Sequence, residues 1–298
     1  MKETCASAFV IAMMLGSGHA FAGNTATIDQ DGDHNQATVM QSGKNTATVL
    51  QDGSDNDATV VQSGKSSAIV EQMWSSNEAT VNQNGYNIAT VYQLGRGSLS
   101  TIDQDGSGND AVIRQDGAFD IGRRSTASIK QDGLNNAATI NQSGAEGAHA
   151  DIEQSGWNHE TDVTQTSTEF VSARIVQSGG SRGGNNASID QDIAFASSAK
   201  IEQRGSSNEA DIDQGNSSRS SADLYQWGSN NTANVIQGHD GNTADGTQIG
   251  HRNTMSVNQA GSTHTVDGTQ LGHDNTMNVN QAGSHIGLNQ ATVHQTSW

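Results

Sequence analysis

The sequence predicts an all-β fold, a β-solenoid of about 12 two-strand rungs with two parallel, in-register sheets. The main observation is a seven-residue phrase, Asn/Ser-x-Ala-x-Ile/Val-x-Gln, which occurs in 24 copies between Asn24 and Gln295. The phrase alternates with a period of two, which is the pattern of a β-strand with two different faces. The first gaps between glutamines alternate between 11 and 10 residues, so two strands and two turns form one rung.

Within each copy, the recurring residues fall on one face of the strand. The other face varies freely, as positions that point to solvent do. The recurring face is therefore predicted to point inward and to act as a ladder for self-assembly. Its candidate residues are Asn24, Ala26, Ile28, Gln30, Asn35, Ala37, Val39, Gln41, Gln62, Gln83, Gln104, Asn275, Gln281, Asn289, Ala291, Val293 and Gln295.

The inward amides explain why the copies stack in register. A buried amide without partners costs about 1–3 kcal/mol. An amide directly above an identical amide donates to one neighbour and accepts from the other, as in cross-β assemblies. A slip of one residue would turn glutamine and isoleucine outward, so the register is strongly specified. With strands spaced by about 4.8 Å, 12 rungs predict a stack of roughly 58 Å that is compatible with cross-β packing.

The composition agrees with a thin stack rather than a globular core. The chain has no proline and 34 glycines, which are placed to form tight turns between the strands. Only 32% of the residues are hydrophobic, and the net charge is −18, a combination that also occurs in disordered chains. The regular repeat favours the ordered stack. Longer gaps at residues 118–124, 178–184 and 193–196 are predicted to be enlarged turns.

The N-terminus reads as a targeting segment. Lys2 precedes an apolar run from Ala6 to Leu15, and Ala20-Phe21-Ala22 is a typical cleavage site. Residues 1–22 are therefore predicted to be a signal peptide and residues 23–298 the repeat solenoid. The single cysteine, Cys5, lies within the signal peptide, so the exported chain has neither disulfides nor thiolate metal sites.

The paired phrases resemble the curlin repeat of the subunits that build curli, the extracellular amyloid fibres of bacterial biofilms. The resemblance spans the chain from Asn24 to Gln295. It implies a secreted structural subunit that passes through the periplasm and an outer-membrane secretion pore, and that forms adhesive fibres on the cell surface. The implied partners are further copies of the chain, end to end, and a related nucleator or major fibre subunit. The residues do not distinguish between these last two roles.

Other functions have little support in the sequence. No motif of a serine hydrolase, zinc protease or nucleotide-binding loop is present, and we expect neither catalysis nor a cofactor. The 14 basic residues against 32 acidic ones disfavour nucleic acid as a partner. The Asp-Gly turns lack the tandem pattern of calcium-binding solenoids, so dedicated calcium sites are not expected.

Two features leave alternatives open. Seven of the first eight strands carry threonine three residues before the glutamine, so a secreted monomeric solenoid with an adhesive or ice-binding face is the alternative function. Histidines crowd the last 60 residues, and His251 and His273 lie one rung apart. They are interpreted as duplicated turn residues, with a shared metal or a pH response as the alternative. We expect the end rungs to be uncapped, with edges free to pair.

Overall fold

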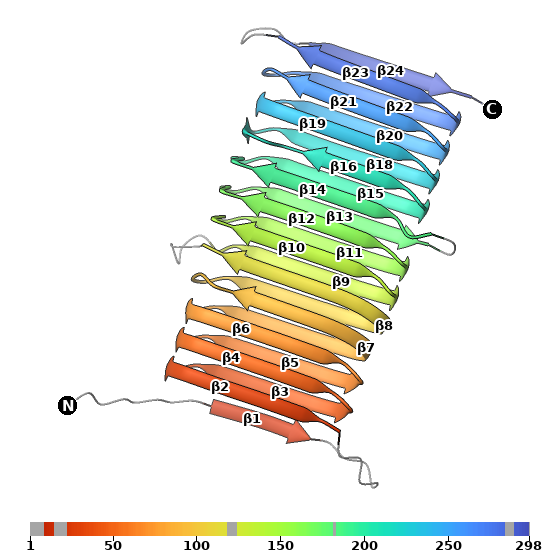
Figure 1. Cartoon of the computed structure of the whole chain (residues 1–298). Coiled ribbons are helices and arrows are strands. Elements are labelled where there is room, and N and C mark those ends of the chain that lie inside the picture. Colours follow the sequence, from red (N-terminus) through yellow and green to blue (C-terminus); the bar gives the residue numbers. More distant parts are fainter. Residues whose placement is uncertain (1–8, 15–22, 118–123, 181–182, 284–288, 298) are drawn as a thin grey trace. The chain divides into compact units, whose positions relative to one another are not determined.

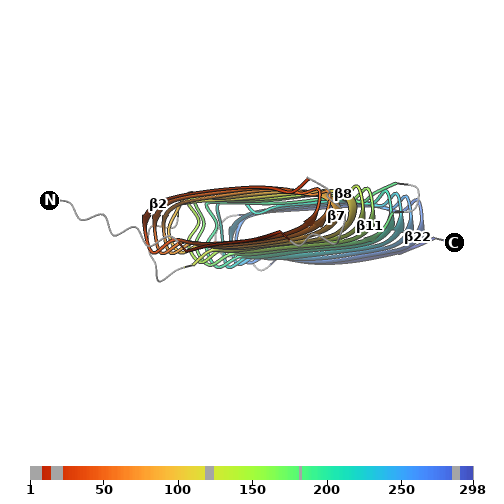
Figure 2. The same ribbon diagram turned by 90° about the horizontal axis from the view of Figure 1, so that it is seen from below.

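The structure is a computed structural model that describes residues 9–14, 23–117, 124–180, 183–283 and 289–297. The chain forms two compact units, residues 1–147 and 148–298. Both units are built from parallel strands that stack rung upon rung (Figure 1). Viewed from below, each unit shows two layers of strands that are joined by turns (Figure 2). Among the described residues, no helix is long and apolar enough to cross a membrane.

The first unit contains ten strands. They are β1 (Phe9–Met14), β2 (Thr25–Asp33), β3 (Gln36–Gly43), β4 (Thr46–Ser54), β5 (Asp57–Gly64), β6 (Ser67–Ser75), β7 (Glu78–Gln93), β8 (Leu99–Asp116), β9 (Thr126–Leu134) and β10 (Ala137–Ser143). β2, β4 and β6 continue into the second halves of β7 and β8 and then into β10. β3 and β5 continue into the first halves of β7 and β8 and then into β9.

The second unit contains fourteen strands. They are β11 (His149–Trp157), β12 (Glu160–Thr166), β13 (Ser172–Gly179), β14 (Asn186–Asp192), β15 (Ser198–Ser206), β16 (Glu209–Asp213), β17 (Ser217–Ser218), β18 (Ser221–Ser229), β19 (Thr232–Asp240), β20 (Thr243–His251), β21 (Thr254–Ala260), β22 (Thr265–His273), β23 (Thr276–Ala282) and β24 (Gln290–Thr296). One stack runs β11-β13-β15-β18-β20-β22-β24. The other runs β12-β14-β16-β19-β21-β23. The short strand β17 pairs with β19.

The register places like residues above one another. Gln41 lies opposite Gln62, and Val39 lies opposite Val60. The side chains alternate along each strand, so that Val39 and Gln41 are buried while Met40 between them is exposed. The prediction of an all-β solenoid with parallel, in-register strands is therefore confirmed.

The turns show why glycine follows most of the glutamines. Gly43 has φ of 120°, a conformation that residues with a Cβ rarely adopt. A Cβ at Gly43 would also overlap the carbonyl oxygen of Gly64 in the next rung. Trp74 is a departure, because it takes the glycine place opposite Gly53 with φ of 71°. Of the predicted enlarged turns, residues 118–123 and 181–182 lie outside the described residues.

The N-terminal segment contributes one strand. β1 pairs in parallel with β3, so that Phe9 lies opposite Gln36 and Met14 lies opposite Gln41. This strand belongs to the apolar run that is predicted to be the centre of a signal peptide. The predicted cleavage site at residues 20–22 and Cys5 lie outside the described residues. The signal peptide therefore stays a prediction.

Candidate functional site: amide ladders and end rungs

The inward glutamines form continuous ladders of side-chain hydrogen bonds. In the first unit, the Gln41 amide Nε2 donates to Gln62 Oε1 over 2.9 Å, and Gln62 donates to Gln83 over 2.8 Å. The ladder continues through Gln104 to Gln131, each step at 2.8 Å. The other stack repeats the pattern from Gln30 through Gln51, Gln72, Gln93 and Gln115 to Gln142.

The second unit carries two ladders of the same kind. One runs from Gln154 through Gln177, Gln203, Gln226, Gln248 and Gln270 to Gln295. The other runs from Gln165 through Gln191, Gln214, Gln237 and Gln259 to Gln281. In every step of both units, the glutamine earlier in the chain donates and the later one accepts. The ladders therefore have a direction.

Most ladder glutamines also join the two sheets by a second hydrogen bond. The Gln62 Nε2 donates a second hydrogen bond to the carbonyl oxygen of Thr46, over 3.1 Å, at the start of the preceding strand. Gln83 does the same to Ser67, and Gln259 to Thr243. Both N–H groups of the amide are thus used, which removes the cost of burying an amide. These crossing bonds were not predicted, although they join residues at a recurrent separation of about 16.

The inward asparagines form a second set of ladders that run the opposite way. The backbone N–H of Asn45 donates to Asn24 Oδ1 over 2.9 Å, and that of Asn56 donates to Asn35 Oδ1 over 3.1 Å. In the second unit, the chain of acceptors includes Asn185, Asn208, Asn231 and Asn253, and it ends with Asn275 as donor. Here the later residue donates to the earlier one. A rung is thus held by two opposed sets of hydrogen bonds.

His159 replaces asparagine in one of these ladders. Its Nδ1 accepts from the backbone N–H of Asn185 at 3.1 Å, and its Nε2 lies 3.2 Å from the carbonyl oxygen of Ser155. Because the first partner only donates and the second only accepts, the ring is the neutral tautomer with hydrogen on Nε2. Burial lowers the pKa of His159, against the opposing effect of hydrogen bonds to the Ser155 and Gly179 carbonyls. This role was not predicted, and its only signal is that histidine stands at a position where asparagine recurs.

The ladders end in complementary groups at the first and last rungs. Gln30 Oε1 and Gln41 Oε1 are buried acceptors with no hydrogen-bond partner among the described residues. At the other end of the sequence, Gln281 and Gln295 each accept from the preceding rung. Their Nε2 groups donate only to the carbonyls of Thr265 and Thr276, so one N–H of each remains open within the described part of the chain.

The end rungs are also less buried than the rungs between them. Ala37, Val39, Gln41, Gln62, Gln83 and Gln104 are at most 3% exposed, and Gln281 is 7% exposed. Of the residues predicted to form the inward ladder, Asn289 is exposed. Those that are half-buried are Asn24, Ala26, Ile28, Gln30, Asn275, Ala291, Val293 and Gln295. An end rung covers its inward face on one side only, so the ladder residues there keep contact with solvent.

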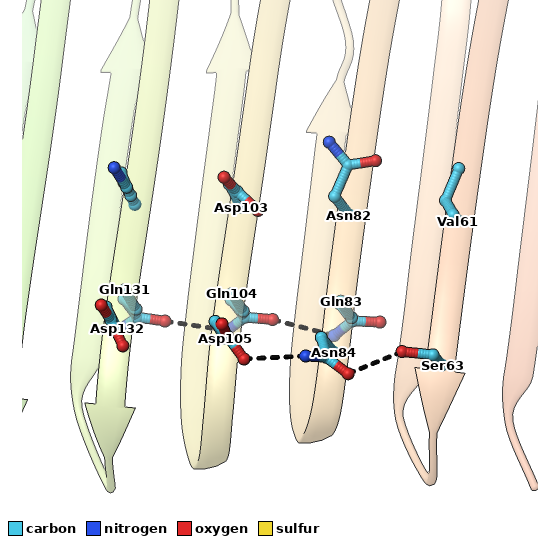
Figure 3. Close-up of a pocket in the computed structure, with 11 residues that line it drawn as sticks. Val61, Ser63, Asn82, Gln83, Asn84, Asp103, Gln104, Asp105, Gln131 and Asp132 are labelled. Atoms are coloured by element: carbon cyan, nitrogen blue, oxygen red, sulfur yellow. Dashed lines mark hydrogen bonds between the residues drawn. The ribbon is translucent and has the colours of Figure 1, made fainter. Parts of the chain in front are cut away.

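The outward faces carry acidic columns. Figure 3 shows a shallow groove over β5, β7, β8 and β9, where Ser63 donates to Asn84 and Asn84 donates to Asp105 across successive strands. On the second unit, burial and then the neighbouring carboxylates, Asp213 first, raise the pKa of Asp190. Burial and the Asp223 and Asp267 carboxylates likewise raise the pKa of Asp245. Stacking therefore brings like charges together.

The structure also shows where the C-terminal histidines and the outward threonines lie. The rings of His251 and His273 stack with centroids 5.0 Å apart and an interplanar angle of 12°. No group of three or more histidine, cysteine, aspartate or glutamate side chains suited to a metal occurs among the described residues. His285 lies outside the described residues. A single outward column aligns Thr38, Thr59, Thr80 and Thr101 on successive rungs.

Comparison with known proteins identifies the repeat. The family model of the curlin associated repeat matches residues 22–46, 43–64, 87–117 and 122–156. These stretches of the chain are similar to the curlin associated repeat. The match at residues 43–64 spans β4 and β5, which form one two-strand rung of the solenoid. The matched residues thus include many of the ladder glutamines, such as Gln51, Gln62 and Gln104. No curated protein sequence matches the chain.

Proposed function

We propose that this curlin-repeat chain is the structural subunit of a curli-like extracellular amyloid fibre that serves adhesion and the biofilm matrix. The matched repeat belongs to a family of structural subunits, and the ladder geometry supports a polymer. The observation that carries the proposal is the pair of open ends. Buried acceptors at Gln30 and Gln41 match open donors at Gln281 and Gln295.

The proposed joint continues the spiral from one copy into the next. β24 lies on β22, so the next strand of a continuing spiral belongs over β23. β2 of a second copy would then pair with β23, and its β3 with β24. Aligning the repeats makes Gln281 donate to Gln30 and Gln295 donate to Gln41. The asparagine ladder would continue across the joint as well. Asn275 Oδ1 and Asn289 Oδ1 would accept hydrogen bonds from backbone N–H groups in the first rungs of the next copy.

The same alignment avoids repulsion at the joint. Thr292 faces Thr38 and Val293 faces Val39, so the β24–β3 seam pairs like with like. Across the β23–β2 seam, Asp29 faces Asn280 rather than a second carboxylate. Like charges directly opposite each other on paired strands are destabilising. A tail-to-tail joint would instead set donor against donor at the glutamines, and a head-to-head joint would set acceptor against acceptor. Head-to-tail growth is therefore favoured.

The proposed export route, location and second partner rest on the similarity to the curlin repeat and on the predicted signal peptide. The subunit would be exported to the periplasm and reach the cell surface through an outer-membrane secretion pore. A related nucleator or major subunit would be a second partner, because any chain with the same ladder spacing can pair with an open end. No enzymatic activity is proposed.

The alternative is a secreted monomeric solenoid with an adhesive or ice-binding face. The threonine column at residues 38, 59, 80 and 101 is the observation that favours it. These threonines are half-buried, and they form one column in their sheet. The columns beside them mix charged, amide and aliphatic side chains, as at Gln36, Asp57 and Val61. This surface is less regular than the ladder beneath it.

Assembly of the chain 23–298 tests the proposal. Purified protein at neutral pH should form fibres visible by negative-stain microscopy, and preformed fibres should seed their growth. Aligned fibres should diffract near 4.8 Å along the fibre axis and near 10 Å across it. A chain that stays monodisperse for days in the presence of seeds would support the monomeric alternative instead.

A further inference from the structure

The edge of β3 that the proposed joint uses is already occupied in the structure. β1 pairs in parallel with β3 over six residues. In the joint, residues 290–295 of another copy would face residues 36–41. β1 sets residues 9–14 opposite the same six residues. The leader strand thus uses the same edge, direction and register as an incoming β24.

β1 supplies the backbone pairing but leaves the ladder incomplete. Met14 stands opposite Gln41, where the joint would place Gln295. Methionine has no N–H group in its side chain, so it cannot donate to a glutamine oxygen. In agreement, Gln41 is only 3% exposed and its Oε1 has no partner among the described residues. A buried carbonyl oxygen without a donor is unfavourable. Replacement of β1 by β24 would remove this cost.

We propose that the edge of β3 is the docking site for β24 of a second copy, and that the leader strand Phe9–Met14 blocks this site until it is removed. The inference rests on the proposed function, since it names the partner and the control of the same end rung. Residues 9–14 then have a second role besides targeting. They keep the precursor from polymerising before export.

The block has a specific consequence for growth. An uncleaved chain cannot add through its own β2 and β3, because β1 covers β3. It can add through β23 and β24 to the open first rung of a fibre, but the new tip then carries its own leader. Growth stops after that single addition. Uncleaved chains therefore cannot sustain elongation at either end of a seed.

The experiment compares seeded elongation by four chains that all carry Cys5→Ser where that residue is present. They are chain 23–298, full chain 1–298 recovered from the cytoplasm, the full chain with Ile11→Pro, and the full chain with Ser17→Pro. Proline lacks the N–H that strand pairing needs, so Ile11→Pro disrupts β1. Ser17→Pro is the matched control, because it places the same residue in the leader three positions after Met14. Seeds are made from chain 23–298, and fibre length is followed by microscopy.

We expect chain 23–298 and the Ile11→Pro full chain to lengthen seeds at similar rates, and the other two full chains not to lengthen them. The inference is overturned if the unmodified full chain elongates at the rate of chain 23–298. It is equally overturned if Ile11→Pro stays blocked, since the block would then not depend on strand pairing. Failure of chain 23–298 itself to elongate would contradict the proposed function, which makes the two failures distinguishable.

Discussion

Met255 fills the space that a side chain at Gly246 would occupy on the facing strand. A Cβ at Gly246 would lie only 2.7 Å from Met255 Sδ, and 2.6 Å from Cδ2 of Leu224 in the neighbouring rung. In the repeat, Gly246 stands where most copies have isoleucine or valine, and Met255 stands where most have alanine. The rung thus exchanges its large and small residues between its two strands. Gly268 and Met277 repeat the exchange in the next rung.

The exchange predicts a compensating pair of substitutions. Met255→Ala alone should lower the free energy of unfolding by about 2–5 kcal/mol, because it leaves a cavity. Gly246→Val alone should also destabilise, because its side chain meets Met255 as well as the flexible end of Leu224. The double variant restores the usual repeat and should recover most of the loss. Urea midpoints of the folded chain measure this, with exposed Met40→Ala as the control. Strictly additive effects would contradict the packing described.

The glutamine ladder predicts a large difference between inward and outward substitutions. Replacing Gln41, Gln62 and Gln83 with alanine removes three consecutive ladder residues and leaves the carbonyls of Thr25, Thr46 and Ser67 without their donors. Each loss should cost about 1–3 kcal/mol. Replacing the outward neighbours Thr38, Thr59 and Thr80 with serine should change little. Assembly half-times of the two triple variants make the comparison, and equal slowing would show that the inward role is wrong.

The acidic columns predict that mild acid favours the folded, assembled state. Burial and nearby carboxylates raise the pKa values of Asp190 and Asp245 above the ordinary 3.8. The folded state therefore binds protons at a higher pH than the unfolded state, and its stability rises as pH falls through the raised pKa values toward 3.8. Added salt screens the same repulsion at neutral pH. Fibre growth should speed up under both conditions.

Substitution of the paired aspartates tests whether they cause this dependence of stability on pH. Asp190→Asn with Asp213→Asn should increase stability at neutral pH and weaken its dependence on pH. The exposed Asp31→Asn is the control. Slower growth of the unmodified chain in both acid and salt would mean that attractive charge pairs, such as Arg252 with Asp274 at 2.7 Å, dominate instead.

His159 predicts an opposite, local response to pH. Burial lowers its pKa, so the folded state binds a proton less readily than the unfolded state. The contribution of His159 to stability is fully present above the unfolded value of 6.5 and falls as pH drops below it. His159→Asn restores the usual ladder residue and should remove this loss. Urea midpoints at pH 8 and pH 5.5 should differ less in the variant, and an unchanged difference would exclude the neutral tautomer as the cause.

Much of the fold could be predicted because the repeat encodes it directly. The alternation around Gln41 predicts its inward face, and the 21-residue spacing predicts that Gln41 and Gln62 stack. The crossing bond from Gln62 to Thr46 could not be predicted, because it depends on how closely the two sheets approach. The direction of the ladders could not be predicted either, since a side-chain amide can donate to the neighbour on either side. β1 was missed because its apolar residues predict targeting and carry no repeat.

The most direct test of end-to-end stacking is a cross-link across the proposed joint. Chains 23–298 with Thr38→Cys are mixed with chains carrying Thr292→Cys, assembled and oxidised mildly. Adjacent strands are about 4.8 Å apart, which suits the Cα separation of a disulfide. If β24 of one copy pairs with β3 of the next, this mixture forms covalent dimers. The control mixture of Thr27→Cys with Thr292→Cys forms few, because Thr27 would lie on the other sheet. Fibres that give no dimers in the first mixture, or equal amounts in both, would contradict the stacking of β3 on β24.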